Sequence, residues 1–240
     1  MGRKPNKRMA PARKRWAPLT RPKTAKELAN IKRAIDVTDR IFRELDNPFG
    51  RSERDVAREI RARAKRLGAG LAFQPIIASG RNAGYVHHKP GQKIVREYEP
   101  VIFDIGFKVG GQCTDVTRMH MPKAKGGKKF RRFYRDALEM QRKCIGKAVA
   151  GRSLKEINGS WKKLMRQKGY KVKHSIGHGV GSRVHERVKG PLKPGMVITI
   201  EPGVYERKKY GLRVEDMVLV TRGRPKILTR KIKFTGGFKK

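Results

Sequence analysis

The feature of this sequence that most constrains its fold is an internal repeat. A segment with a serine cap and a glycine stop runs over residues 52–68, and a similar one returns at 153–169, offset by 101 residues. Each is followed by a glycine-bearing stretch with a histidine, then by a proline, an apolar strand with an acid and a second strand with an acid. The acids at matching places are Asp104 with Glu201, and Asp115 with Glu215. The repeat predicts two similar halves whose acids face each other across a pseudo-twofold axis.

Helical periodicity and turn residues predict the elements within each half. Thr24-Ala25-Lys26-Glu27 forms a capping box, and apolar residues at helical spacing follow it to Leu45. Glycines 110 and 111 are typical of a hairpin turn. Further helices are expected over 52–68, 130–149 and 153–169, and strands over 73–78, 101–105, 114–121, 197–200 and 211–220. This order of elements predicts an α+β fold.

The chain divides by composition into a core and two basic ends. Residues 1–23 contain no acid, carry four prolines and show no helical periodicity, so we expect a disordered basic tail. Residues 24–232 are expected to form one folded domain, and residues 233–240 a basic C-terminal tail.

Charge and cysteine content limit the partners and the compartment. The chain has 61 lysines and arginines against 20 acids, a formal net charge of +41. Such a surface attracts polyanions such as RNA or ribosomes, although a generally basic surface without a dedicated partner explains the charge equally well. No window approaches the roughly 20 apolar residues of a membrane span, and no secretory signal is present. Two cysteines outside any metal-type spacing favour a reducing compartment, so we expect a cytoplasmic protein.

The placement of the scarce acids indicates a metal site. Asp104 interrupts an apolar run, and Glu201 ends another. A buried carboxylate is costly unless it is paired with a cation or bound to a metal. A salt bridge would explain any one acid alone. Four acids related by the repeat, together with His178 in a Gly-His-Gly sequence, favour two divalent ions, and mostly oxygen ligands favour Mn²⁺, with Co²⁺, Fe²⁺ or Zn²⁺ as alternatives.

Several of these stretches resemble the pita-bread metallopeptidases, which include methionine aminopeptidase, Xaa-Pro aminopeptidase and prolidase. The resemblance covers roughly residues 24–230. It rests on Phe103-Asp104-Ile105-Gly106, Thr114-Asp115-Val116-Thr117-Arg118, Ile176-Gly177-His178-Gly179-Val180-Gly181, Val184-His185-Glu186, the stretch from Pro194 to Gly203, and Arg213-Val214-Glu215-Asp216. It implies the pita-bread fold, in which two ααβ halves surround a curved antiparallel sheet.

The resemblance also implies the role of each site residue. Asp104, Asp115, His178, Glu201 and Glu215 would hold two divalent ions, and Glu201 would act as the general base. His185 would stabilise the tetrahedral intermediate, and His87 would contact the scissile peptide. Arg118 and Arg213 would support the acids, whereas His88 is expected to have an ordinary surface or capping role.

The sequences around Asp115 and Glu215 are similar to the Xaa-Pro branch. They imply an aminopeptidase or dipeptidase that acts on short peptides or nascent N-termini. That branch carries a further N-terminal domain where only the basic tail is expected here, so proline specificity remains open and the chain is expected to be a monomer or a homodimer. A methionine aminopeptidase is one alternative. A non-catalytic protein of the same fold that binds RNA or ribosomes is the other.

Overall fold

The computed structural model describes residues 18–122 and 127–234. The helices are α1 (Ala25–Glu44), α2 (Glu53–Arg66), α3 (Gly127–Ile145) and α4 (Leu154–Gln167), with a short 3₁₀ helix η1 (Gly80–Gly84). The strands are β1 (Gly70–Leu71), β2 (Ile76–Ser79), β3 (Val101–Ile105), β4 (Phe107–Val109), β5 (Gln112–Cys113), β6 (Val116–His120), β7 (Val197–Ile200), β8 (Gly203–Glu206), β9 (Tyr210–Arg213), β10 (Asp216–Leu219) and β11 (Lys226–Ile227).

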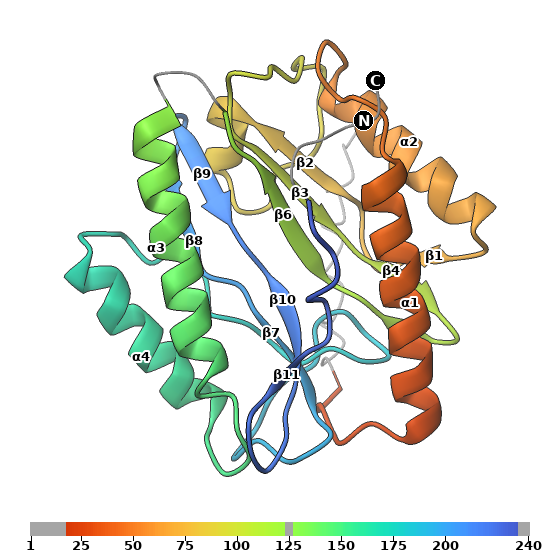
Figure 1. The fold of residues 1–240 in the computed structure, drawn as a ribbon, viewed down its shortest axis with the longest axis vertical. Coiled ribbons are helices and arrows are strands. Elements are labelled where there is room, and N and C mark those ends of the chain that lie inside the picture. Colours follow the sequence, from red (N-terminus) through yellow and green to blue (C-terminus); the bar gives the residue numbers. More distant parts are fainter. Residues whose placement is uncertain (1–17, 123–126, 235–240) are drawn as a thin grey trace, which may run out of the picture.

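Two helix pairs lie on opposite sides of a central layer of strands (Figure 1). The pair α1 and α2 contacts strands β1, β2, β4 and β5 of the first half. The pair α3 and α4 lies on the other side, where α3 contacts β7, β8 and β9. The α+β fold and its two ααβ halves are therefore confirmed.

The helices begin at the residues that the sequence indicates. Thr24 and Ser153 each close a reciprocal capping box, and Ser52 accepts a hydrogen bond from the backbone of Asp55. These side chains satisfy backbone N–H groups that a helix N-terminus leaves without partners. The two serine caps start the helices α2 and α4 of the repeat, so both halves fix their second helix in the same way.

The central layer consists of small antiparallel sheets. Strand β3 pairs with β2 and β6, and β7 pairs with β10, which also pairs with β11. Strand β8 pairs with β9, and β4 pairs with β1 and β5. Gly110 and Gly111, at φ +53° and +80°, form the predicted turn between β4 and β5. Asp104 lies near the end of β3, and Glu201 directly follows β7, the strand at the corresponding place in the second half.

Three clusters of buried apolar side chains form the hydrophobic core of the two halves. One packs α1 and α2 on the first-half strands, and a second packs α3 and α4, centred on the fully buried Trp161, on β7 and β10. The third joins the halves, because it contains Ile102 and Met119 from the first half and Leu212 and Val214 from the second. The interface between the halves is thus closed by apolar packing beside the acids.

The strand predicted over 211–220 is wrong as a single element. The chain leaves β9 after Arg213 and enters β10 at Asp216, so Val214 and Glu215 form a break between two sheets. Strand β8, which the sequence analysis missed, pairs with β9 instead. The break turns the Glu215 side chain toward Thr117 of β6, whose hydroxyl donates a hydrogen bond to it at 2.8 Å.

Residues 18–23, called the strap below, pack on the domain, so the expected tail boundary at residue 23 is wrong. The Thr20 amide donates to the Arg187 carbonyl at 2.9 Å, and the Lys23 amide donates to Gly195 at 2.8 Å. The Lys23 ammonium lies 2.7 Å from a Glu186 carboxylate oxygen, and both side chains are buried. The strap therefore lies against the segment that carries His178 and His185.

The chain also packs on the domain beyond the boundary expected at residue 232. The ring of Phe234 lies 4.9 Å from that of Phe103 and 5.1 Å from that of Phe42, measured between centroids. Residues 1–17 and 235–240, the rest of the two expected tails, lie outside the described residues.

Candidate metal centre

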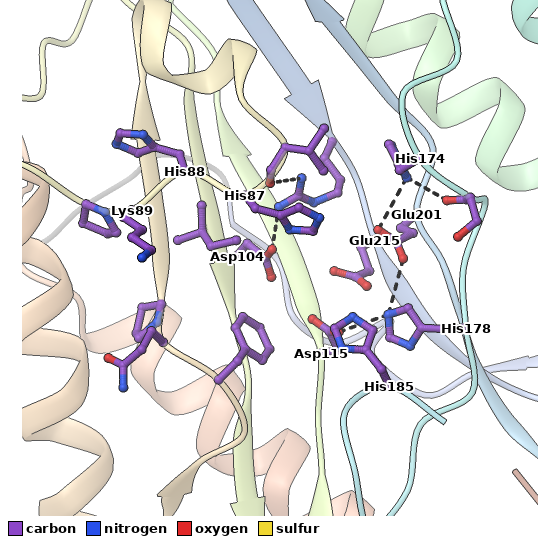
Figure 2. A pocket seen from close by; sticks show the side chains of 18 residues that line it. His87, His88, Lys89, Asp104, Asp115, His174, His178, His185, Glu201 and Glu215 are labelled. Atoms are coloured by element: carbon purple, nitrogen blue, oxygen red, sulfur yellow. Dashed lines mark hydrogen bonds and ion pairs between the residues drawn. The ribbon is translucent and has the colours of Figure 1, made fainter. Parts of the chain in front are cut away.

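The four predicted acids meet at the centre of the molecule, although they come from four different places in the chain. Asp104 lies near the end of β3, and Asp115 lies between β5 and β6. Glu201 directly follows β7, and Glu215 lies in the break between β9 and β10. Figure 2 shows these side chains around one pocket, with His178 on the same side as Glu201.

Hydrogen bonds between the His178 backbone and Thr199 of β7 hold His178 beside these acids. Its amide donates to the Thr199 hydroxyl at 3.1 Å, and its carbonyl accepts from the Thr199 amide at 2.8 Å. A side chain on the preceding Gly177 would lie 2.0 Å from the Thr199 carbonyl oxygen, so only glycine permits this approach. The glycines of the Gly-His-Gly sequence thus bring the imidazole next to β7.

The distances within the cluster fit shared coordination of cations. The His178 Nε2 atom lies 3.4 Å from a Glu201 oxygen and 3.5 Å from an Asp115 oxygen. Three overlapping sets each bring three ligand atoms within 4.8 Å of one another: Asp104 with Asp115 and Glu215, His178 with Glu201 and Glu215, and Asp115 with His178 and His185. All five predicted ligands are therefore brought together, and Asp115, His178 and Glu215 each belong to two of the sets.

The electrostatics of the cluster are unfavourable without a cation. Burial, together with the charges of Asp104 and Glu201, raises the pKa of Asp115 well above its usual value. Burial and the neighbouring acids Asp115, Glu201 and Asp104 do the same to the pKa of Glu215, and burial raises the pKa of Glu201. These shifts arise because low dielectric and like charges disfavour the ionised form.

Arg213 compensates part of this negative charge, but among the four acids it forms a hydrogen bond with Asp104. Its guanidinium donates to Asp104 at 2.5 Å, to the Tyr205 hydroxyl at 2.7 Å and to the Thr117 hydroxyl at 3.0 Å. Arg118 instead donates to the Glu215 carbonyl at 2.6 Å and to Asp216 at 2.8 Å. Both arginines thus support the acids, and one arginine in direct contact leaves most of the negative charge unbalanced.

The residues present fit divalent cations. The buried Asp104 Oδ1 atom has no hydrogen-bond partner among the described residues. An unsatisfied buried carboxylate oxygen is costly, and its neighbours are further carboxylates. Oxygen donors with a single imidazole are the ligand type of hard or intermediate divalent ions. A cation would satisfy this oxygen and relieve the repulsion among the acids.

The histidines of the pocket differ in their environments. The pocket holds about 440 Å³ and is lined by His87, His88, His174, His178 and His185. The ring centroid of His185 lies 4.2 Å from that of His178, and burial lowers the pKa of His185 to about 4. His185 is therefore a neutral imidazole near neutral pH. His87 is exposed at the pocket wall.

His174 was missed by the sequence analysis. Its ring lies between Trp161 and Tyr205, at 5.4 Å and 5.3 Å between centroids, and its Nδ1 atom is 3.9 Å from a Glu201 oxygen. Burial lowers its pKa to about 4. Its position four residues before His178 was the available signal, but a single histidine in a polar, glycine-bearing segment does not stand out.

The expectation that His88 has an ordinary surface or capping role is wrong. Its Nε2 atom lies 2.7 Å from Glu53, a carboxylate with no exposed side-chain surface at the start of α2. Glu53 also accepts hydrogen bonds from the Ser79 amide and hydroxyl, the Asn82 amide group and the Gly91 amide. Burial favours a raised pKa for Glu53, but the hydrogen bonds from His88 and Ser79 lower it overall. Glu53 therefore fixes residues 88–91 at the pocket wall as a buried anion.

Replacement of Glu53 with glutamine is expected to loosen this wall. The amide cannot accept all of the hydrogen bonds, and the lost charge-assisted bonds correspond to roughly 3 kcal/mol of stability. We expect a lower melting temperature and faster amide hydrogen exchange across residues 85–91. The exposed Glu97→Gln is the matched control. Unchanged exchange in that segment in the Glu53 variant would contradict this role.

The chain belongs to metallopeptidase family M24, whose sequence profile matches residues 29–222. Curated relatives include the Xaa-Pro dipeptidases of Pyrococcus furiosus and Pyrococcus horikoshii, each 34% identical over 219 residues. Each alignment covers 87% of this chain and 63% or 62% of the relative, so the chain spans less than two thirds of their length. The resemblance to the Xaa-Pro branch is confirmed.

Solved structures agree with this assignment. The prolidase from Pyrococcus furiosus superposes with a TM-score of 0.81 at 33% identity, over 87% of this chain and 65% of that one. The X-Pro aminopeptidase from Thermotoga maritima gives a TM-score of 0.81 at 31% identity, over 87% and 61% of the two chains. The pita-bread fold expected from the sequence is therefore confirmed.

Proposed function

We propose that this chain is a dinuclear-metal-dependent peptidase that hydrolyses the N-terminal peptide bond of short peptides, with Xaa-Pro bonds as its substrates. The observation that carries the proposal is a set of four carboxylates, three of them buried, and one imidazole around a pocket, with Asp104 Oδ1 left without a hydrogen-bond partner among the described residues. The names of the relatives, Xaa-Pro dipeptidase and X-Pro aminopeptidase, support the substrate class.

The ligands would be Asp104, Asp115, His178, Glu201 and Glu215, which the overlapping sets of neighbouring ligand atoms contain. Mn²⁺ is the preferred ion for such ligands, with Co²⁺, Fe²⁺ and Zn²⁺ as alternatives. When bound, a pair of divalent ions lowers the pKa of water and polarises a carbonyl group.

The protein side chains would divide the remaining work. Glu201 would accept the proton of the attacking water, since its carboxylate lies within the cluster and faces His178. His185, neutral near pH 7, would donate a hydrogen bond to the oxygen on which negative charge develops. His87, exposed at the pocket wall, would contact the scissile peptide. Arg213 would keep Asp104 in place.

The test is hydrolysis of Gly-Pro, Ala-Pro-Ala and Met-Ala-Ser by protein stripped with a chelator and then reloaded with Mn²⁺ or Co²⁺. We expect no cleavage by the stripped protein, recovery on reloading, and binding of about two ions per chain, as a dinuclear site requires. Preference for the proline peptides supports the Xaa-Pro assignment, whereas release of Met from Met-Ala-Ser identifies a methionine aminopeptidase. Failure to cleave any peptide with ions bound contradicts the peptidase proposal.

A second candidate function rests on the net charge of +41. Exposed Lys155, Lys163 and Arg166 on α4 have no ion pair within the described residues, and they would attract phosphates of RNA or a ribosome. RNA binding that weakens steeply with salt and needs no divalent ion would favour this candidate.

None of the helices in the described ranges combines the length and apolar composition that a membrane crossing requires. We propose a cytoplasmic location, with the chain as a monomer or homodimer.

A further inference from the structure

A second cavity, called the basic groove below, lies apart from the metal centre. It holds about 430 Å³ and shares no lining residue with the pocket of the metal centre. Its walls come from η1, the segment before β3, the first turn of α3 and the turn between β8 and β9. The helix α3 and the strand β9 begin side by side at one end of the molecule (Figure 1), and η1 also packs against β8 and β9. The groove therefore lies at a junction between the two halves.

The basic groove carries two cations that have no partner. Arg81 and Lys209 are exposed, and neither side chain forms an ion pair or a hydrogen bond among the described residues. Lys209 ends a turn that also contains Arg207 and Lys208, both of them exposed. This turn and Arg81 give the rim of the groove an excess of positive charge, which attracts phosphate groups.

The acid in the lining of the groove, Glu99, is neutralised by a cation of its own. Glu99 forms an ion pair with Lys93, whose ammonium group also donates to the Ser79 hydroxyl at 3.1 Å. A Cβ atom on Gly80 would lie 2.6 Å from the carboxyl carbon of Glu99, so glycine is what allows the acid to lie against η1. The charges of the lining that remain unpaired are therefore positive.

Two aromatic side chains line the same groove. Tyr98 is 66% exposed, more than any other large apolar side chain in the described ranges. Phe130 is half-buried and packs edge-on against Tyr210, with 5.5 Å between the ring centroids. A nucleic-acid base stacks on an exposed aromatic ring whatever its identity, because every base has an aromatic face. The groove thus combines cations that suit a phosphate with a ring that suits a base.

We propose that the basic groove binds a nucleoside phosphate, with the phosphate at Arg81 and Lys209 and the base stacked on Tyr98. The volume of the groove lies in the range of sites that hold small ligands. The ligand is either a free nucleotide or one unit of a single-stranded RNA, since both present the same phosphate and the same flat ring. This inference goes beyond the peptidase function and does not depend on it. It also differs from attraction by net charge alone, because net charge offers no ring for the base.

The test titrates the Mn²⁺-loaded protein into labelled AMP, and separately into a labelled oligo(U) of about four nucleotides, and follows fluorescence anisotropy. Tyr98→Ala should raise the Kd about 10-fold, as expected for the loss of one stacked base, whereas Tyr98→Phe should retain the affinity. Because Tyr98 lies outside the metal centre, kcat for Gly-Pro should stay unchanged, which also shows that the variant folds.

The phosphate contact is tested by the salt dependence of oligo(U) binding. Arg81→Gln should raise the Kd and lower the slope of log Kd against log salt concentration by about 0.7, the share of one phosphate contact on a single strand. Arg166→Gln, the same change on α4 outside the groove, is the matched control and should have a smaller effect on the Kd.

The two probes separate the two sources of the ligand. Tighter binding of oligo(U) than of AMP identifies RNA, and AMP binding that is equal or tighter identifies the free nucleotide. A Kd that Tyr98→Ala leaves unchanged overturns the groove as a binding site, as do equal effects of Arg81→Gln and Arg166→Gln, or no binding of either probe. None of these results bears on the peptidase function, which stands or falls on the cleavage of peptides.

Discussion

Replacing Glu201 with glutamine is expected to lower kcat by about 10²–10⁴-fold, the usual contribution of a positioned general base. The glutamine has nearly the same shape, so the Thr199 and His178 contacts of Glu201 are disturbed little. It cannot accept a proton at neutral pH, and it weakens one ligand of the cluster. The measurement is kcat for Gly-Pro or Ala-Pro-Ala, together with the melting temperature and the number of bound ions.

Glu206→Gln, the same change on β8 outside the cluster, is the control and should leave kcat unchanged. The melting temperature of the Glu201 variant shows whether it folds. If a folded Glu201→Gln protein with ions bound retained full kcat, another group would have to take the proton, and the assignment of Glu201 would be wrong.

Replacing Lys23 with methionine is expected to destabilise the protein by about 3 kcal/mol, because it leaves the Glu186 carboxylate buried without its cation. The exposed fractions of the two side chains are 3% and 5%, so water does not replace the lost partner. For a chain of this length the loss corresponds to roughly 6–12 °C in Tm. Loss of this ion pair should also weaken the contact between the strap and the segment that carries His178 and His185. The affinity for metal ions should therefore fall. Thermal unfolding and metal titration measure both effects.

The double variant Lys23→Met with Glu186→Gln should recover part of the lost stability, because no isolated charge remains buried. Arg40→Ala, which breaks the exposed pair with Glu44, should cost less than about 0.5 kcal/mol. A Lys23→Met protein as stable as the Arg40→Ala protein would show that the buried Lys23–Glu186 pair contributes nothing to stability.

The acids of the site were predictable because each stands out from its neighbours in the sequence. Asp104 interrupts a run of apolar residues that could only be a buried strand, and Glu201 ends a second such run. The repeat then relates these acids to Asp115 and Glu215 and places all four at one interface. The fold class follows from the same repeat, since the capped helices and the strands recur in order.

Glu53 and Lys23 were missed because nothing beside them in the sequence indicates burial. Glu53 stands in the first turn of a charged helix, where an acid normally faces water, and it is buried by partners 26 to 38 residues further along the chain. Lys23 stands in a basic segment, and its partner Glu186 is 163 residues away. Tertiary packing decides both positions. Strand β8 was missed because Pro202-Gly203 is typical of a turn, and its pairing with β9 outweighs that local signal.

The position of the acids between the halves implies a conflict between activity and folding. Each half contributes two carboxylates, so the halves must bring like charges together whenever they dock without ions, and apolar contacts such as those of Ile102 and Leu212 oppose this repulsion. The four carboxylates that the proposed activity requires thus oppose the docking of the two halves, and loss of stability is a common cost of functional sites. Divalent ions would then stabilise the contact between the two halves. A newly synthesised chain would reach its full folding stability only after it binds them.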